Sequence, residues 1–213
     1  LTGTPTYVKV KGEIELNATV DVPATKNIML VAAEDTTIKR AAGFTGSMFT
    51  VNGGNLQMAG GSVTDSNGTA IGSGSLTVDG SGDGVTGSIV EVVSGNYGLT
   101  DDAVLTGNKT TGNAGAISNP ADGNVYLLGG TITGNSATTG GAIYSEGAVS
   151  IRGTVSVTGN TVINSTPETA SNVVLDKNGI INVNGAVTGS TIGLAVQEAA
   201  AGRTVVKIAD GVT

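Results

Sequence analysis

Short groups of alternating apolar and polar residues recur along the chain and are separated by glycine, asparagine, aspartate or serine. The clearest groups are 141–144 (Gly-Ala-Ile-Tyr), 148–151 (Ala-Val-Ser-Ile) and 154–158 (Thr-Val-Ser-Val-Thr). A period of two is typical of β-strands, whose successive side chains point to opposite faces. The pattern therefore predicts an all-β chain made of many short strands.

The strand groups repeat with a period of about 25 residues. The tripeptide Thr-Gly-Asn occurs at 106–108, 133–135 and 158–160, and the tripeptide Gly-Ala-Ile occurs at 115–117 and 141–143. A diverged copy at 56–64 resembles 125–133, at a separation that suggests about three coils of roughly 23 residues each. Such repeats predict a solenoid, because each repeat can bury its apolar side chains only against its neighbours.

We therefore predict a single-stranded right-handed parallel β-helix (β-solenoid), with three short strands per coil of about 25 residues and roughly eight coils. The handedness follows from the general preference of parallel crossover connections, and the hexapeptide period of left-handed β-helices is missing. Denser charge near the start predicts that residues 1–45 form an N-terminal cap and first coil. Residues 46–213 then form the remaining coils of one structural domain, which we expect to continue into a longer chain.

Glycine followed by asparagine marks the predicted corners of the coils. A sharp corner needs residues that accept positive φ, which glycine does freely and asparagine more readily than other residues with a side chain. The repeat would place Asn108, Asn135 and Asn160 above one another, where stacked amides can hydrogen-bond along the axis. The alternative is a set of ordinary polar surface turns, and we favour the stacked arrangement.

Composition agrees with a slender aliphatic core. Glycine accounts for 35 of the 213 residues, charged residues for 13%, and only 4 residues are proline. A disordered chain has few β-branched residues and a high net charge, so this valine- and isoleucine-containing chain should fold. Its 4 tyrosines and 2 phenylalanines are few for a β-sandwich, whereas stacked aliphatic side chains need no large rings.

The net charge, the length of the apolar runs and the absence of cysteine exclude several classes of protein. The net charge is −7 and the 10 basic residues are scattered, whereas a nucleic-acid-binding protein shows a basic face or stripe. No apolar run approaches the roughly 18 residues of a membrane span, so we predict no direct membrane insertion. The absence of cysteine excludes disulfides and thiolate metal sites.

The sequence predicts no enzyme, because the groups that catalysis needs are missing or scattered. Histidine is absent, which removes the commonest general base. A polysaccharide hydrolase needs two or three carboxylates converging on one groove, and a lyase needs an arginine or lysine base beside an acidic or calcium cluster. Arg40, Arg152 and Arg203 are far apart in the coil register. We assign no catalytic residue and no bound cofactor.

Two acidic pairs come nearest to a metal site. Asp79 and Asp83 lie between Gly80, Gly82 and Gly84, a loop that would form at most a weak calcium site. We favour a solvated turn. Asp101 and Asp102 are adjacent and are interpreted as ordinary turn residues.

Hydroxyl residues form a candidate array on one sheet face. The three segments 62–64 (Ser-Val-Thr), 131–133 (Thr-Ile-Thr) and 156–158 (Ser-Val-Thr) would each project hydroxyls outward. Regular threonine ranks on a β-helix can order water into an ice-like plane, so an ice-binding face is a remote alternative. Threonine is also simply a good strand former.

One stretch resembles known bacterial surface proteins. Residues 140–144 (Gly-Gly-Ala-Ile-Tyr), preceded by 132–137 (Ile-Thr-Gly-Asn-Ser-Ala), resemble the Gly-Gly-Ala-Ile repeats of polymorphic outer-membrane proteins and related β-helical adhesins. Residues 27–51 are similar to the opening coil of pectin-lyase-like repeat proteins. The resemblance covers 100–165 best, and it implies an extracellular or cell-surface location, flanking domains of a long chain, and attachment to host cells, matrix or glycans.

Taken together, we expect a non-catalytic extracellular β-helical module of a large bacterial surface or secreted protein, which acts in adhesion or as a display stalk. The alternative is a polysaccharide-binding or polysaccharide-cleaving domain, for which Tyr97, Tyr126 and Tyr144 are the candidate aromatic platforms. Of these, we expect Tyr144 to pack against a neighbouring coil instead. A ligand should lie along a strand face or at a loop such as Asn119–Asn124 or Ser165–Ser171.

Overall fold

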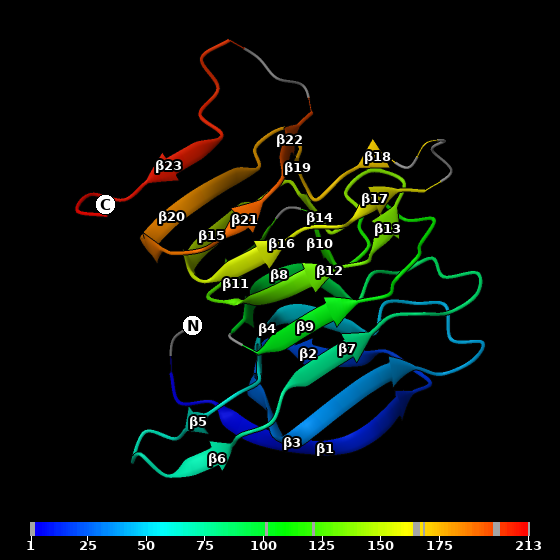
Figure 1. Ribbon diagram of the computed structural model, residues 1–213, viewed down its shortest axis with the longest axis vertical. Coiled ribbons are helices and arrows are strands. Elements are labelled where there is room, and N and C mark those ends of the chain that lie inside the picture. Colours follow the sequence, from blue (N-terminus) through cyan, green and yellow to red (C-terminus); the bar gives the residue numbers. More distant parts are fainter. Residues whose placement is uncertain are drawn as a thin grey trace.

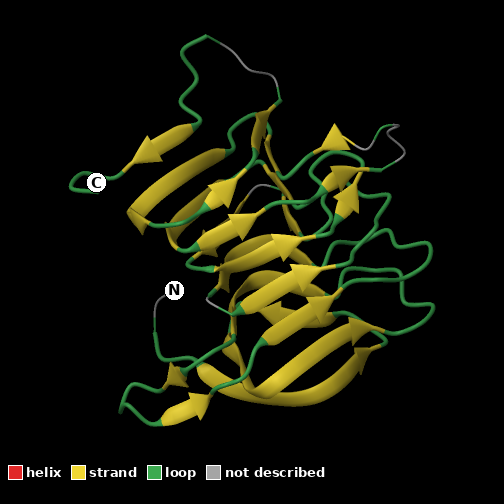
Figure 2. Ribbon diagram, in the orientation of Figure 1, coloured by secondary structure: helices red, strands yellow, loops and turns green. Residues whose placement is uncertain are grey.

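The computed structural model describes residues 3–100, 102–120, 122–163, 167, 169–197 and 201–212. These residues form strands, turns and loops and include no helix (Figure 2). Among them there is accordingly no helix long and apolar enough to cross a bilayer. Most strands join one 18-stranded, largely parallel sheet that wraps around a central core. The predicted all-β class and solenoid-like stacking of parallel strands are therefore confirmed.

The large sheet consists of three ranks of parallel strands stacked one above another (Figure 1). Rank A contains the first halves of β1 (Thr6–Leu16) and β3 (Asn27–Arg40), the second halves of β4 (Phe49–Ala59) and β8 (Val90–Leu99), and then β11 (Asp122–Leu127), β15 (Ala148–Gly153), β20 (Ile180–Val187) and β23 (Val206–Ile208).

The other two ranks complete each turn of the chain. Rank B contains the second halves of β1 and β3, followed by β7 (Leu76–Asp79), β9 (Ala103–Thr106), β12 (Gly130–Thr133), β16 (Val155–Val157) and β21 (Thr191–Ile192). Rank C contains β2 (Val20–Pro23), the first halves of β4 and β8, and then β10 (Ile117–Asn119), β14 (Ile143–Ser145), β19 (Val173–Leu175) and β22 (Leu194–Val196).

Small strands lie outside these ranks. The strand β5 (Val63–Thr64) pairs antiparallel with β6 (Ala70–Gly72) in a hairpin. A second group contains β13 (Ser136–Ala137), β17 (Thr161–Val162) and β18 (Thr169–Ala170).

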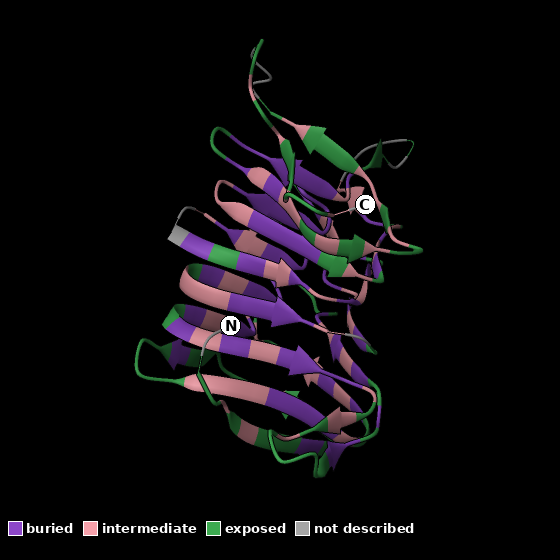
Figure 3. Ribbon diagram, turned by 90° about the vertical axis from the view of Figure 1, so that its left-hand side faces the viewer, coloured by how far each residue is buried: buried purple, intermediate pink, exposed green. Residues whose placement is uncertain are grey.

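The core consists of aliphatic rows that run along the stack. Alternate residues of each strand point inward and meet their register partners in the next coil, which produces the alternation of buried and half-buried positions in Figure 3. One rank A row contains Leu30, Met58, Leu99, Leu127 and Ile151, all buried. Burying each such side chain contributes about 2 kcal/mol. A core built in this way needs few aromatic rings.

The repeat length varies more than the sequence indicated. Leu56 pairs with Tyr97 and Tyr97 pairs with Val125, so the two similar segments at 56–64 and 125–133 begin two coils apart. The prediction of three coils is wrong because the β5–β6 hairpin is inserted into one of them. Alternating residues occur both in a solenoid strand and in a surface hairpin, so the pattern alone could not separate the two.

The Gly-Ala-Ile repeats mark a point where two coils approach closely. A Cβ atom on Gly115 would overlap the carbonyl oxygen of Gly141, and a Cβ on Gly141 would overlap the backbone of Thr161 and Ser171. Glycine is therefore required at both positions by steric contact between successive coils.

Asparagine side chains form a buried ladder at one corner. Asn108, Asn135 and Asn160 are fully buried, and the backbone N–H of each donates to the side-chain oxygen of the next: Asn108 to Asn135 at 3.1 Å and Asn135 to Asn160 at 3.0 Å. The ladder continues to Asn172, whose Oδ1 accepts from the Asn160 backbone N–H at 3.2 Å and from its Nδ2 at 2.9 Å. These amides satisfy corner backbone groups that lie away from water.

The positive φ at these corners belongs to the glycines. Gly107, Gly134 and Gly159 have φ between 67° and 77°, whereas Asp102 is the one non-glycine residue with positive φ in the described part of the chain. Our expectation that asparagine would take the left-handed conformation is therefore wrong. Glycine takes that conformation without a Cβ penalty, and the following asparagine is left free to point inward.

The segment predicted as an N-terminal cap and first coil, residues 1–45, contains β1, β2 and β3. Its outward side chains include an ion-paired group in which the Lys39 ammonium lies 2.6 Å from Glu13 and 3.4 Å from Glu15. The first coils enclose an apolar pocket of about 190 Å³, which is lined by side chains of β1, β2, β3 and β4, among them Val8, Ile14 and Val20. The boundary at residue 45 stays a prediction.

Replacing Asn135 with alanine should lower the free energy of unfolding by about 3 kcal/mol, because it leaves several buried backbone groups without partners. The Asn135 Nδ2 donates to the carbonyls of Leu105 and Thr133, both at 3.0 Å, and its Oδ1 accepts from Asn108. Urea unfolding followed by circular dichroism measures the change.

The matched control is Asn124→Ala, which removes an exposed amide and should cost less than about 1 kcal/mol. Equal losses in the two variants would show that the buried ladder does not stabilise the corner.

Candidate functional site

The acidic residues predicted as weak metal ligands serve the turn that contains them. The Asp79 Oδ1 accepts from the backbone N–H of Ser81 at 2.9 Å and from its hydroxyl at 2.5 Å, while Asp83 is exposed in the same loop. Across the residues that the structure describes, no group of three or more acidic side chains is placed to hold a metal ion. Asp101 lies outside the described residues, and Asp102 is an exposed turn residue.

The three arginines occupy three unrelated environments. Arg40 is buried and donates from Nε to the carbonyl of Gly80 at 3.0 Å, with its guanidinium 5.1 Å from the centre of the Phe44 ring. Burial lowers the pKa of Arg40 from its usual value. Arg203 donates to backbone carbonyls, including that of Asp176 at 2.8 Å, and Arg152 is exposed on β15.

The tyrosines proposed as aromatic platforms differ in their exposure. Tyr97 is fully buried, its hydroxyl donates to the Met58 sulfur at 3.3 Å, and burial raises its pKa well above the usual value. Tyr144 is also buried and packs with Ala114 and Val174, as expected for a residue that contacts neighbouring coils. Tyr126 is half-buried and points outward from β11. Of the three, Tyr126 alone can offer a ring to a ligand.

Tyr126 lines a groove on the outer face of rank A. The groove has a volume of about 230 Å³ and is lined by Tyr126, Leu128, Ser150, Ile151, Arg152 and Asn184. A second hollow of about 290 Å³ adjoins it through Asn184 and is lined also by Asn182, Lys207, Ile208, Ala209 and Asp210. We call the two together the rank A groove.

Strand register places these side chains in line. Tyr126 pairs with Ser150, Ser150 with Asn182, and Asn182 with Lys207, so a ring, a hydroxyl, an amide and an ammonium follow one another up the stack. Parallel pairing with a period of two requires all four to point to the same outer face.

The polar groups of the rank A groove are largely available to a ligand. The Asn184 Nδ2 donates to the Ser150 hydroxyl at 3.2 Å. Within the described part of the chain, the Tyr126 hydroxyl, the Arg152 guanidinium and the Lys207 ammonium have no protein partner. Two cations and one carboxylate, Asp210, give the groove a positive balance on a chain of net charge −7. Such a surface can bind a polar, hydroxyl-rich ligand.

A second asparagine ladder follows the outer face of rank A. Asn27, Asn55, Asn96 and Asn124 are register partners. The Asn96 Nδ2 donates to the Asn55 Oδ1 at 2.6 Å, and the Asn124 Nδ2 donates to the Asn96 Oδ1 at 3.2 Å. Sequence analysis missed this ladder because the step from Asn55 to Asn96 is much longer than the steps on either side of it.

The loops predicted to hold a ligand are only partly available. Asn119 is fully buried and donates to the Ser145 hydroxyl at 2.9 Å, while Asn124 is exposed and residue 121 lies outside the described residues. In the 165–171 loop, Ser171 is buried and donates to the Thr139 carbonyl, and residues 165, 166 and 168 lie outside the described residues.

One segment of the predicted hydroxyl array lies elsewhere. Ser62 and Thr64 belong to the β5–β6 hairpin, so their placement in a common face is wrong. The other two segments do lie on one face: Thr131 of β12 and Ser156 of β16 are register partners in rank B. Thr133 ends β12, and Thr158 directly follows β16.

Comparison with known proteins gives no match, whether to a family model, a curated protein or a solved structure.

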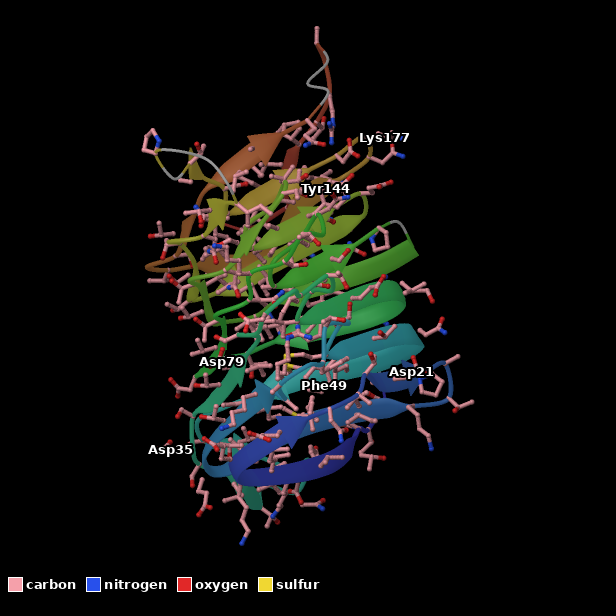
Figure 4. All side chains as sticks on the ribbon, turned by 90° about the vertical axis from the view of Figure 1, so that its right-hand side faces the viewer. Asp21, Asp35, Phe49, Asp79, Tyr144 and Lys177 are labelled. Atoms are coloured by element: carbon pink, nitrogen blue, oxygen red, sulfur yellow. The ribbon has the colours of Figure 1, made fainter. Side chains whose placement is uncertain are left out.

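One carboxylate–phenol pair ties two rank C strands together. The Tyr144 hydroxyl donates a short hydrogen bond to Asp176, and Glu146 lies 3.3 Å from the same hydroxyl. Figure 4 shows Tyr144 and Lys177 on the same side of the upper coils. The hydrogen bonds from Tyr144 and from the Lys177 backbone N–H hold the pKa of Asp176 below its usual value of 3.8, and burial raises that of Tyr144.

Tyr144→Phe should destabilise the protein more at about pH 7 than at about pH 2. Because the folded-state pKa of Asp176 is lowered, its contribution to stability is present above the ordinary pKa of 3.8 and is lost as the pH falls through the folded value. Urea unfolding of both proteins at the two pH values measures the difference. Tyr7→Phe, in an outward tyrosine of β1, is the control and should change little at either pH; a Tyr144→Phe loss that is independent of pH would contradict the assignment.

Proposed function

We propose that this chain is a non-catalytic extracellular β-helical module of a large bacterial surface or secreted protein, which acts in adhesion or as a display stalk. We infer that its coils form a single-stranded right-handed parallel β-helix of roughly eight turns, consistent with right-handed parallel crossovers. The observation that supports the proposal is the in-register stacking of all three ranks along the described chain.

Such stacking suits a spacer. Each coil adds about 4.8 Å along the axis, so about eight coils make a rod roughly 40 Å long. Side-chain ladders inside the corner and on the outer face of rank A join successive coils in addition to the backbone bonds. A rod of this kind can hold other domains, or its own outer faces, away from the surface that carries it.

The chemistry of the rank A groove supports binding rather than turnover. Asp210 is the single carboxylate of its lining, whereas glycoside hydrolysis uses a pair of carboxylates on either side of the bond. The chain contains no histidine to act as a general base. Neither adjacent cation is paired with an acidic cluster that would neutralise a uronate.

The rank A groove favours one second candidate function, the binding of a polysaccharide. Concave sites with an aromatic surface and a few convergent polar groups are the usual form of small-molecule and sugar sites. The Tyr126 ring supplies the apolar surface, and Ser150, Arg152 and Asn184 supply hydrogen-bond donors to sugar hydroxyls. In an adhesin this groove would be the point of attachment to a host or matrix glycan.

Tyr126→Ala should weaken retention on glycans or on host cells by about tenfold, the loss expected when one aromatic contact worth about 1.4 kcal/mol is removed. A glycan array followed by titration calorimetry against the best ligand measures the change. Tyr7→Ala is a matched control, because Tyr7 occupies the same outward register row of rank A at the other end of the stack. Equal effects of the two variants would exclude the groove as the binding site.

The same protein should be incubated with polyuronates and neutral glycans, with and without calcium. Release of unsaturated or shortened products would overturn the non-catalytic proposal, whereas retention of intact chains supports it.

A further inference from the structure

The outer face of rank B carries a regular grid of hydroxyl groups. Register pairs Thr37 with Thr77, Thr77 with Val104, Val104 with Thr131, and Thr131 with Ser156. A second column, two residues further along each strand, contains Thr106, Thr133 and Thr158. We define the rank B grid as Thr77, Thr106, Thr131, Thr133, Ser156 and Thr158, with Val104 among them.

The hydroxyls of the rank B grid are left unused by the protein. Its residues are half-buried, and within the described part of the chain none of their hydroxyls forms a hydrogen bond with another protein group. Elsewhere, serine and threonine hydroxyls bond to the chain, as do Ser47, Thr100 and Ser190. The grid hydroxyls are therefore free to bond outside the molecule.

The geometry of the rank B grid is set by the sheet. Neighbouring strands lie about 4.8 Å apart, and alternate residues of one strand about 6.7 Å apart. The strands β7, β9, β12 and β16 lie one above another along one side of the molecule, which gives the grid two columns (Figure 1). Two fixed spacings of this kind give the hydroxyls the two-dimensional regularity that binding to a crystal surface requires.

The chemistry of the rank B grid disfavours a sugar or a protein partner. It carries no aromatic ring of the kind that sugar sites use, and it lacks the aromatic or arginine anchors typical of protein interfaces. Charged residues of the columns lie at one end: Asp79 is beside Thr77 on β7, Lys39 and Glu15 continue the second column beneath it, and Glu13 pairs with Thr37 in the first column. Threonine presents a methyl group and a hydroxyl together, so each side chain can hold one water while excluding its neighbours.

We propose that the rank B grid binds the surface of ice through a layer of ordered water. Six fixed hydroxyls on rigid strands lose little conformational entropy when they join a lattice, because their backbone positions are already set by coil stacking. In the first column Val104 lies between Thr77 and Thr131 and has no hydroxyl, but its methyl groups would still contact the water layer. This function is independent of the rank A groove, which lies on a different face.

Thr133→Lys in the full chain should remove most of the inhibition of ice recrystallisation and most of the thermal hysteresis that the unmodified protein shows. A lysine at this central position breaks the spacing of the second column and carries a strongly hydrated charge. Thr158→Lys, one strand further, should act in the same way and serves if the first variant does not fold. Circular dichroism verifies folding of each variant.

The matched control is Thr50→Lys, which places the same side chain at an outward, half-buried threonine of rank C. It should keep the full effect on ice. No inhibition by the unmodified protein beyond that of an inert acidic protein would overturn the proposal, as would equal activity of the Thr133→Lys and Thr50→Lys proteins. Self-association through this face, detected by sedimentation and abolished by Thr133→Lys without any effect on ice, would also overturn it.

Discussion

The fold depends on one constraint: every coil must repeat the register of the coil beneath it. In a parallel ladder with a side-chain period of two, each residue meets its equivalent in the next coil, and an inward residue stays inward along the whole stack. The aliphatic row through Leu30, Met58, Leu99 and Leu127 is the direct result. A single shift by one residue would turn such a row toward water, so the register is set by burial as well as by backbone bonds.

The same constraint orders the outer faces. Residues that face outward are stacked as regularly as the core, so each outward position becomes part of a row that runs along the stack. In rank A the row through Tyr126, Ser150, Asn182 and Lys207 produces a groove with varied polar groups. In rank B the rows are dominated by threonine, and the result is a uniform grid. One backbone arrangement thus presents two outer faces that differ in side-chain chemistry.

Sequence patterns revealed those features whose spacing stays nearly constant. The Thr-Gly-Asn corners recur at almost equal steps because no long insertion separates them, and so their stacking could be predicted. The outer ladder of Asn27, Asn55, Asn96 and Asn124 could not, because the β5–β6 hairpin and longer turns change the coil length from one step to the next. The rank A groove could not be predicted from the sequence either, because its lining residues become neighbours only once the strand register is known. Of these residues, only Tyr126 is identifiable from the sequence as a candidate aromatic platform.

Arg40 completes the buried asparagine ladder at Asn108, where the Thr-Gly-Asn repeat ends. The Oδ1 of Asn108 has no further asparagine below it, and this buried acceptor would lose a hydrogen bond at a cost of about 1–3 kcal/mol. The corner of the next coil down carries Gly80, where a Cβ would overlap Asn108 and the Ile89 side chain. The absence of a side chain there leaves room for Arg40, which reaches past Gly80 from the coil below and donates to the Asn108 Oδ1 at 3.2 Å. Three more of its five N–H groups donate to the carbonyls of Gly80, Phe44 and Gly46. The cation is therefore buried among neutral oxygens rather than beside a carboxylate. The repeating corner can therefore give way to a non-repeating one while the buried Asn108 Oδ1 keeps a hydrogen-bond donor. A solenoid can change its corner sequence and keep its register when the exposed end of such a ladder is satisfied in this way.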